Sequence, residues 1–474
     1  MGAAVSIEHL TPEQMKEYEQ VKDLPEPQIR SHLLSKFPSL TPQKQQTSSL
    51  SPMASFTRIK PLTVDNLSGT ESSKQITSHT ETSITMSSNT TSIKLFSRSK
   101  TIPPSATQLE VYSKVAQPLV SRFVEGYDVD LLSYGQTCSG KTYTMFGPPQ
   151  SMREAARDAD AGNFNLKDEH GFVLRAGLEV LSFIEELKGK GSKALLHGCM
   201  VEMSILSLTD QSVRDLQQGW AVCFVDEESH LQGAEQKELN SAEDVARFAA
   251  SVETRLTRGT NMNDTSSRSH CIAGFKLTTL NSKKTEVRES RLQFFDLMGS
   301  ERFKGQNAAH DESKSSHSSM GGCEGIYSNL SLMALTSCVK AASDLRRKSV
   351  KKGGGGKKGK KEDKVAGMLL TKVLAGSLTG HALTGIVTCV SQAPRNGDES
   401  WLSLQNGGEM AKILNKPQLQ PSRNCEKVLA NARKKKKECE DVVARGVAGK
   451  YQALRQAQVK QWAGQVHILE KLLM

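Results

Sequence analysis

The run GQTCSGKT, from Gly135 to Thr142, constrains this chain more than any other stretch. It matches the pattern G-x-x-x-x-G-K-[ST], in which glycines let the backbone wrap around phosphate oxygens and a lysine adds a point charge. Apolar residues before it predict a buried strand (Val129, Leu131, Leu132), and the residues after it are compatible with a helix. The N-terminus of such a helix would favour a bound anion, and Thr142 would offer its hydroxyl to Mg²⁺. The stretch therefore predicts a phosphate-binding loop.

Two further polar stretches would complete a nucleotide site. NDTSSRSH, at 263–270, puts four hydroxyls and an arginine into eight residues, which is too polar for a core strand. DLMGSE, at 296–301, follows an apolar run that predicts a buried strand. An acidic residue at a strand end, followed by a glycine, is where nucleotide hydrolases place a carboxylate facing Mg²⁺ and a backbone N–H that can sense the γ-phosphate. The three stretches together indicate a nucleotide sensor.

In this order the three stretches resemble the phosphate loop, the first switch and the second switch of the kinesin motor domain. The family patterns for the two switches are N-x-x-SSRSH and DLAGSE. Further matches are TQLEVY before the loop, TNMN before the first switch and SNLSLMAL after the second. The resemblance covers roughly residues 56–417, and three long motifs in register make the probability of chance agreement very small.

The resemblance implies the kinesin motor fold, an α/β fold of the P-loop NTPase class. It would have a mixed sheet of eight strands with helices on both faces and the nucleotide at the strand ends. Residues 1–51 would form an N-terminal extension and linker, 52–417 the motor domain, and 418–474 a neck with a short helical tail. Apolar residues are irregularly spaced from 425 onward. This spacing favours a short helical neck, with at most weak homodimerisation through 425–474, over a long coiled coil.

The resemblance also implies an ATP-driven microtubule motor, a microtubule-stimulated ATPase that uses ATP and Mg²⁺. Arg58 and Pro61 resemble the base-binding R-x-R-P motif, although Lys60 replaces its second arginine and lacks a planar guanidinium. The residues assigned to the phosphates are Gly135, Gln136, Thr137, Cys138, Ser139, Gly140, Lys141 and Thr142. Those assigned to Mg²⁺ are Thr142, Ser267 and, behind the direct ligands, Asp296.

Four residues of the two switches are expected to act in catalysis: Gly299, Arg268, Glu301 and Ser267. Gly299 would donate its N–H to the γ-phosphate. Arg268 and Glu301 would pair when the switches close, which would exclude bulk water and orient the attacking water molecule. A surface ion pair of little value is the plainer interpretation of these two residues, but their places in matched motifs favour the catalytic one. Loss of the γ-phosphate would free both switches and move the track-facing helix and the neck.

A basic cluster at 346–364 carries ten Lys or Arg against two acidic residues, a net +8 within the chain's formal +11. No aromatic residue interleaves these lysines, which disfavours stacking on nucleic acid. We expect the acidic tails of tubulin as the partner instead, although a solubilising insertion without a partner remains an alternative. The lysines assigned to microtubule binding are Lys348, Lys351, Lys352, Lys357, Lys358, Lys360, Lys361 and Lys364.

Two departures from the family keep other functions open. Residues 364–374 stand where the family has Y-R-D-S-K-L-T-R-L-L and keep only its L-T pair. The closing helix has Asn406, Gly407 and Gly408 in place of a gap-filling aromatic residue, which predicts a weak helix. A second candidate function is therefore a non-motile microtubule-binding protein with a slow or regulatory ATP site. A nucleic-acid-stimulated ATPase is a third.

The sequence predicts a cytoplasmic protein, because no apolar run is long enough for a membrane span and no signal segment opens the chain. The kinesin resemblance implies that it acts there on the microtubule cytoskeleton. Membrane attachment would depend on myristoylation of Gly2, whose surroundings match the acceptor pattern. Nine cysteines without a C-x-x-C pair indicate reduced thiols rather than disulfides or a zinc site. A capped helix is predicted from Thr11 to about Lys22.

Overall fold

The structure is a computed structural model, and it describes residues 51–62, 74–88, 94–97, 99–205, 211–226, 231–258, 269–301, 331–339, 368–393, 396–446 and 452–474. Everything below refers to these residues. The helix predicted from Thr11, the acylation site at Gly2, the basic cluster, Ser267 and Arg268 all lie outside them. No helix in the described part is long and apolar enough to cross a membrane.

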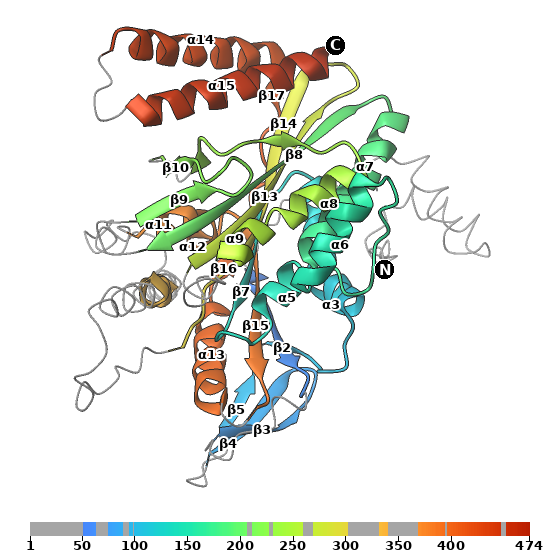
Figure 1. The fold of residues 1–474 in the computed structure, drawn as a ribbon, viewed down its shortest axis with the longest axis vertical. Coiled ribbons are helices and arrows are strands. Elements are labelled where there is room, and N and C mark those ends of the chain that lie inside the picture. The colour runs from blue at the N-terminus through green and yellow to red at the C-terminus, as the bar shows by residue number, and fades with distance from the viewer. Residues whose placement is uncertain are drawn as a thin grey trace, which may run out of the picture. The chain divides into compact units, whose positions relative to one another are not determined.

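A large mixed sheet forms the centre of the described chain (Figure 1). Its strand order is β11-β10-β9-β8-β13-β14-β7-β15-β2-β6, with β12 beside β8 and β17 beside β14. The strands are β2 (Ala54–Lys60), β6 (Lys100–Ile102), β7 (Val129–Tyr134), β8 (Lys193–Ile205), β9 (Gln211–Asp215), β10 (Val222–Val225), β11 (Leu231–Gln232), β12 (Lys237–Glu238), β13 (Ser269–Leu280), β14 (Glu286–Asp296), β15 (Leu383–Ser391) and β17 (Arg423–Asn424).

The expected count of eight strands is too low, because the sheet has twelve. Four of them, β10, β11, β12 and β17, come from loops and from the tail and, like β6, are only two to four residues long. The remaining eight make the mixed sheet that the resemblance implies. In its centre β14, β7, β15 and β2 run parallel, whereas β13 pairs antiparallel with both β8 and β14. All six residues of β7 are buried, as expected of a central strand covered on both faces.

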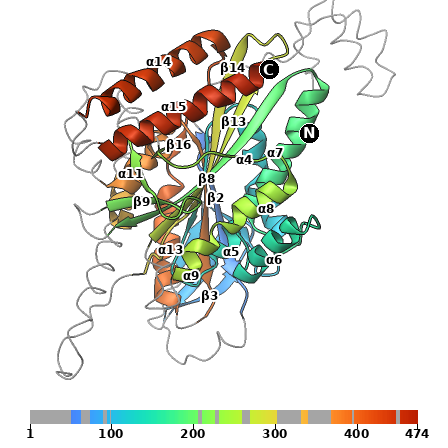
Figure 2. The ribbon, with the colours of Figure 1, turned by 45° about the horizontal axis from the view of Figure 1, so that its top comes forward.

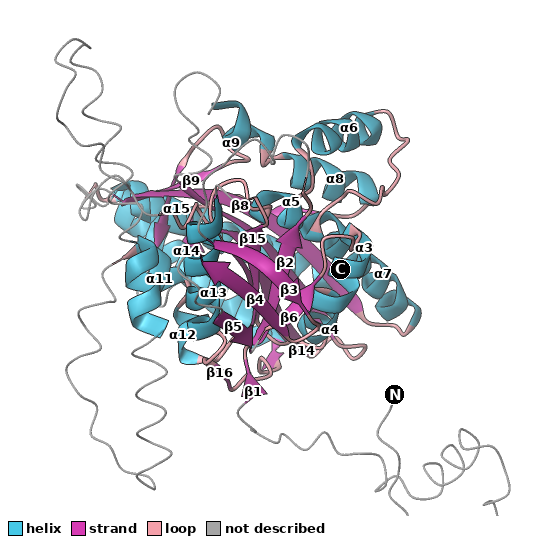
Figure 3. Ribbon diagram, turned by 90° about the horizontal axis from the view of Figure 1, so that it is seen from below, coloured by secondary structure: helices cyan, strands magenta, loops and turns pink. Residues whose placement is uncertain are grey.

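Helices cover both faces of the sheet (Figure 3). One face packs against α3, α4, α6, α7 and α8 through a large apolar cluster that includes Phe123, Phe172 and Phe248. The other packs against a helical segment at 331–339, α11 and α13. The helices are α3 (Gln108–Val115), α4 (Gln117–Val124), α5 (Lys141–Met145), α6 (Pro149–Asp160), α7 (Phe172–Gly189), α8 (Ala242–Ala250), α9 (Glu253–Arg258), α11 (Leu369–Val373), α12 (Ala375–Thr379) and α13 (Gly397–Met410).

Local sequence explains where several helices begin. Thr107 caps α3 in a capping box with Glu110, and the Ser241 hydroxyl accepts from the Asp244 amide at the start of α8. The apolar spacing over 108–125 predicts a single helix, but the structure divides it at Ala116, two residues before Pro118, which cannot donate a helical hydrogen bond. The polar insertion after the phosphate loop is not irregular, because α6 buries a face of small and apolar side chains against α8.

A separate sheet of three strands lies beside the first, made of β3 (Lys74–His79), β4 (Ser83–Ser88) and β5 (Lys94–Ser97). The Ser- and Thr-rich composition of this region predicts little core. The structure corrects that expectation, because Ile84 and Met86 are buried together with Ile59, Val390 and Leu404. This small sheet therefore packs on α13 rather than standing in solvent.

The segment after α13 runs along the large sheet before it becomes helical. β16 (Leu414–Asn415) pairs with β1 (Ser51–Pro52), and β17 pairs with β14. Two helices follow, α14 (Cys425–Ala444) and α15 (Gln452–Leu473), which lie side by side across the β13–β14 end of the sheet (Figures 1 and 2). The basic run 433–437 interrupts the apolar spacing but not the helix, since α14 runs through it and Lys434 and Lys436 lie near glutamates four residues on.

Candidate functional site

The phosphate loop connects the end of β7 to α5, and its glycines are required by the geometry. A Cβ at Gly135 would lie 2.2 Å from the carbonyl oxygen of Cys389 on β15, so any side chain there would push the loop off the sheet. Gly140 has a φ of 104°, in the left-handed region that favours glycine, directly before α5. The loop is therefore held close over the ends of two strands.

Lys141 is buried at the base of this loop. Its ammonium donates hydrogen bonds to the carbonyl oxygens of Gly135 and Gln136, both at 2.8 Å, and burial lowers its pKa from the ordinary value. Gln136 Oε1 and Ser139 Oγ are buried without a hydrogen-bond partner in the described part of the chain. A buried cation beside unsatisfied polar atoms, in a glycine-containing loop that leads into a helix, fits the phosphate groups of a nucleotide.

The carboxylate predicted at the end of β14 meets the last residue of the loop. Asp296 is buried and accepts a hydrogen bond at 2.7 Å from the Thr142 hydroxyl. The guanidinium of Arg255, on α9, donates to the same carboxylate oxygen at 3.0 Å. A hydroxyl held by a carboxylate is a suitable donor set for Mg²⁺, which prefers oxygen ligands.

Arg255 was not predicted as a site residue, yet it is the largest fully buried side chain. It also donates to the carbonyl of Ser269 and lies 3.6 Å from Glu202 on β8, which in turn accepts from the Ser269 hydroxyl. Burial alone would lower the pKa of Arg255, but the charges of Asp296 and Glu202 keep it above its ordinary value. A signal was available, because Glu202 is a carboxylate inside an apolar strand run and such a group needs a cation.

The second switch folds against the phosphate loop. Glu301 accepts a hydrogen bond from the Thr137 amide at 2.8 Å and another from the Thr137 hydroxyl. A Cβ at Gly299 would lie 2.3 Å from Glu301 Oε2 and 2.3 Å from the Thr137 hydroxyl oxygen, so this position has room only for glycine. The Ser300 amide donates to the carbonyl of Gly135 at 3.0 Å. The expected partner of Glu301, Arg268, lies outside the described residues, and Thr137 is the partner that the structure provides.

His270 joins the end of the first switch to two other elements. Its Nδ1 accepts from the Met298 amide at 3.2 Å, so its Nε2 carries the proton and donates to the Ser331 hydroxyl at 3.0 Å. Burial, together with the positive charges of Arg255 and Lys141, lowers the pKa of His270 to about 3. A neutral imidazole therefore connects both switches to the helical segment at 331–339.

The residues assigned to the base form a surface beside the loop. Arg58 donates to Gln108 at 2.6 Å and to Thr144 at 2.8 Å, and its guanidinium lies 5.2 Å from the centre of the Tyr143 ring. Tyr143 is 41% exposed, which leaves a face of its ring available, and Pro61 is exposed. Lys60, which replaces the family arginine, donates to the carbonyl of Cys138 at 3.0 Å and so supports the phosphate loop instead.

Other predicted features are only partly described. The eight lysines assigned to microtubule binding lie outside the described residues, as do Ser267 and Arg268. Among the residues that the structure describes there is no cluster of three or more His, Cys, Asp or Glu suited to a metal ion. The described cysteines are free thiols, and the exposed one is Cys138 in the phosphate loop.

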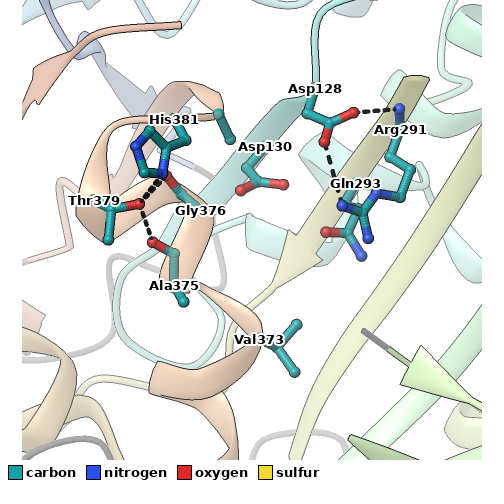
Figure 4. A pocket seen from close by; sticks show the side chains of 10 residues that line it. Asp128, Asp130, Arg291, Gln293, Val373, Ala375, Gly376, Thr379 and His381 are labelled. Atoms are coloured by element: carbon teal, nitrogen blue, oxygen red, sulfur yellow. Dashed lines mark hydrogen bonds and ion pairs between the residues drawn. The ribbon is translucent and has the colours of Figure 1, made fainter. Parts of the chain in front are cut away.

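A hollow near the start of β7 lies at the opposite end of that strand from the phosphate loop, and Figure 4 shows its lining residues. It is a cavity of about 280 Å³ between β7, β14 and the α12–β15 connection. Its carboxylates already have partners, since Asp128 accepts from Arg291 and the buried Asp130 from the Ser377 hydroxyl. This cavity thus has paired carboxylates, whereas Gln136 Oε1 and Ser139 Oγ, unpartnered among the described residues, lie in the phosphate loop.

A family model described as the kinesin motor domain matches residues 58–413. Among curated proteins, the kinesin-like protein KIN-4C of Arabidopsis thaliana is 30% identical over 339 residues, which cover 65% of this chain and 23% of that protein. KIF27 of Rattus norvegicus is 31% identical over 339 residues, which cover 66% of this chain and 21% of that protein. The chain thus spans less than a quarter of the length of these relatives.

Two solved structures share the fold. A fast kinesin, described for its ATPase mechanism and its interactions with microtubules, has a TM-score of 0.60 at 21% identity and covers 79% of this chain and 96% of its own. A KIF14 dimer in a two-heads-bound state, with AMP-PNP and in complex with a microtubule, has a TM-score of 0.60 at 23% identity. It covers 78% of this chain and 96% of its own.

Proposed function

This chain belongs to the kinesin motor domain family, and we propose that it hydrolyses ATP and couples the reaction to binding and movement along microtubules. One observation carries the proposal: the phosphate loop, with the buried Lys141, ends in a hydroxyl that is held by the carboxylate of Asp296. This arrangement joins a phosphate cradle to a site for a hard cation. In the proposed arrangement, residues 52–417 form the motor domain, 1–51 an extension and 418–474 the neck and helical tail.

ATP would bind with its phosphates along residues 135–142. Lys141 would exchange its bonds to the loop carbonyls for phosphate oxygens, while Gln136 and Ser139 would gain the partners that they lack in the described structure. The base would lie on the surface of Arg58, Pro61 and Tyr143. Thr142 and Ser267 would hold Mg²⁺ with Asp296 behind them, and the metal, when bound, neutralises phosphate charge.

Hydrolysis would depend on an exchange of partners by Glu301. In the structure its carboxylate is bonded to Thr137, and pairing with Arg268 would require those two bonds to break. Gly299 would offer its N–H to the γ-phosphate, and Ser267 would contact the same group. Formation of the Arg268–Glu301 pair would exclude bulk water and orient the attacking water molecule. The same exchange would pull on the phosphate loop, because Thr137 belongs to it.

Movement of the switches would reach the microtubule-facing side through His270. Its bonds to Met298 and Ser331 link the second switch to the helical segment at 331–339, which the resemblance assigns to the track surface. The basic cluster that follows would tether the motor to the acidic tails of tubulin through many weak contacts, which fade beyond about 8 Å at physiological salt. Its site of action would then be the microtubule cytoskeleton of the cytoplasm.

Phosphate release measured with and without microtubules tests the proposed function. We expect release to rise with microtubule concentration and not with DNA or RNA. Replacing the ten basic residues of 346–364 by Ser should weaken microtubule binding at low salt and leave the basal rate unchanged. Stimulation by nucleic acid alone would favour a nucleic-acid-stimulated ATPase. If the chain binds microtubules but its rate of phosphate release does not change, the non-motile microtubule-binding protein is favoured.

A further inference from the structure

The α14–α15 hairpin is docked on the sheet by an apolar cluster. Three buried side chains near the end of α15 meet two from the start of α14 and two from the β13–β14 turn region. These residues are Ile468, Leu469, Leu472, Cys425, Leu429, Leu280 and Val287. The helices run antiparallel, since the start of α14 meets the end of α15 in this cluster, and Arg433 of α14 pairs with Glu470 of α15 at 2.6 Å. Figure 2 shows both helices lying across β13 and β14.

A polar rim surrounds this cluster. Lys276 on β13 lies 2.7 Å from Glu289 on β14, and Gln465 of α15 bonds to both of them, at 2.6 and 2.8 Å. Farther along α15, Lys471 bonds to both carboxylate oxygens of Glu238 on β12, at 2.6 and 2.7 Å. The hairpin thus spans several strands rather than touching one turn.

The neck segment, residues 414–424, leads into this hairpin and is bonded to the body along its length. Lys416 donates its amide to the carbonyl of Gly380 at 2.7 Å, and the Gln420 amide donates to Gly126 at 2.9 Å. The Gln420 side chain also donates to Asp128, one of the carboxylates beside the cavity of Figure 4. The last two residues pair with β14 as β17, and the Cys425 amide at the start of α14 donates to Thr285 at 2.8 Å.

We propose that the α14–α15 hairpin is a latch that holds the neck segment on the sheet. The strand β17 passes into α14 without an intervening residue, so the far end of the neck segment cannot leave β14 while Cys425 and Leu429 stay buried in the cluster. Detachment of α15 exposes the apolar face of α14 and frees that end. Release of the hairpin is therefore the step that permits the neck segment to move.

The occupant of this surface is the chain's own α15 rather than a second copy. The connection from β17 to α14 is direct. α15 also packs closely on the loop after β11, because a Cβ added at Gly233 would lie only 2.8 Å from the Cβ of Ala457 in α15. The apolar side chains near the end of α15 are already buried against α14 and the sheet. A homodimer through 425–474 would then require either another surface of the hairpin or its release.

Hydrogen exchange of the full chain tests the latch without relying on the proposed motor activity. The variant Leu469→Asp with Leu472→Asp puts two carboxylates into the cluster. We expect peptides covering 414–425 to exchange at least tenfold faster in this variant, together with peptides of α15. Peptides of β7 should keep their protection. His467→Asp is the control, because it places a single carboxylate at an exposed position of α15 beside the cluster and should leave 414–425 protected.

Two results would overturn the latch: α15 exchanging fast while 414–425 stays protected, or neither segment changing in the double variant. If β7 also loses protection, Leu469→Ala, which adds no charge, gives the same comparison in a milder form. A chain that shows the expected exchange but no microtubule-stimulated phosphate release would retain the latch and lose the proposed function.

Discussion

The two ends of β14 are held by different kinds of contact. At its carboxyl end Asp296 bonds to Thr142 and Arg255, two single polar contacts of 2.7 and 3.0 Å inside the protein. Near its amino end, nine residue steps or about 31 Å away at ~3.4 Å per residue, Val287 lies in an apolar cluster under α14 and α15. Directional bonds between specific atoms cannot be replaced by neighbours, whereas apolar packing and rim charges are shared among many groups. Single changes should therefore have severe effects on function at the first end and graded effects on docking at the second.

The largest expected effect is that of Lys141→Ala. No other cation lies in the phosphate loop, so removal of this ammonium should lower steady-state ATP turnover by more than about 100-fold, the scale of losing one preorganised electrostatic group. Lys114→Ala, on an exposed position of α3, is the control and should keep the parent rate. Both rates are measured as phosphate release at saturating ATP. Turnover close to the parent rate in Lys141→Ala would contradict the assignment of the phosphate loop.

Glu301→Ala should separate binding from hydrolysis. ATP would still be held by residues 135–142, but the pair with Arg268 could not form, and we expect single-turnover hydrolysis to slow by about 100-fold. Affinity for a fluorescent ATP analogue should change little. Thr137→Val removes the hydroxyl partner of Glu301 and keeps its amide partner, so it should release Glu301 more easily without this large loss. Equal hydrolysis rates in Glu301→Ala and the parent would contradict the proposed exchange.

Gly407→Ala tests how tightly α13 packs near the nucleotide end. A Cβ at Gly407 would lie 2.2 Å from the hydroxyl of Thr388 on β15, and such overpacking costs about 1 to 3 kcal/mol of unfolding free energy. Gly408 has no atom within 4 Å of the same position, so Gly408→Ala should stabilise α13 by about 0.5 to 1 kcal/mol. Urea unfolding of the two variants should move in opposite directions. A shift of both in the same direction would contradict the packing of α13 on β15.

These glycines also indicate what the sequence can predict. The motif GQTCSGKT specifies a backbone path and a charge within eight neighbouring residues, so the loop can be predicted from the sequence. The strand before it and the carboxylate of Asp296 can also be predicted, because each belongs to a local apolar run. In Asn406-Gly407-Gly408 only low helix propensity is readable. The structure shows a continuous helix, in which Gly407 permits close contact and Asn406 donates to the Tyr134 hydroxyl at 2.9 Å.

Contacts between distant segments escaped prediction for the same reason. Arg255 matters because α9, β8 and β14 meet around it. Glu202 inside an apolar run indicates that a cation is needed, but no local pattern shows which residue supplies it. The apolar spacing after residue 425 is irregular, and in the structure α15 faces a twisted sheet as well as a helical partner. Sequence spacing records which residues are buried and not what buries them.

His270 predicts a pH dependence at the nucleotide end. Its pKa is about 3 in the folded chain and about 6.5 when unfolded, so between these values the unfolded chain binds one more proton. The unfolding free energy should therefore fall as pH drops below about 6.5, by about 1.4 kcal/mol per pH unit from this residue. His270→Gln should lose that part of the slope when urea unfolding is compared at pH 6 and pH 5. An unchanged slope would mean that the imidazole is not buried in its neutral form.

The smallest effect is expected at the rim of the hairpin, from Lys471→Ala. Lys471 is 44% exposed and pairs with Glu238, and exposed pairs of this kind contribute about 0.2 to 1 kcal/mol. The remaining apolar cluster should keep α15 docked, so exchange of 414–425 should rise by no more than about fivefold, and raising the salt should shrink the difference between variant and parent. Glu238→Ala should have the same effect, and the double variant should add little, because each change already removes the same bond. If Lys471→Ala alone released the hairpin as fully as two aspartates in the cluster, a single polar bond would control this end of β14 too. The contrast between its two ends would then fail.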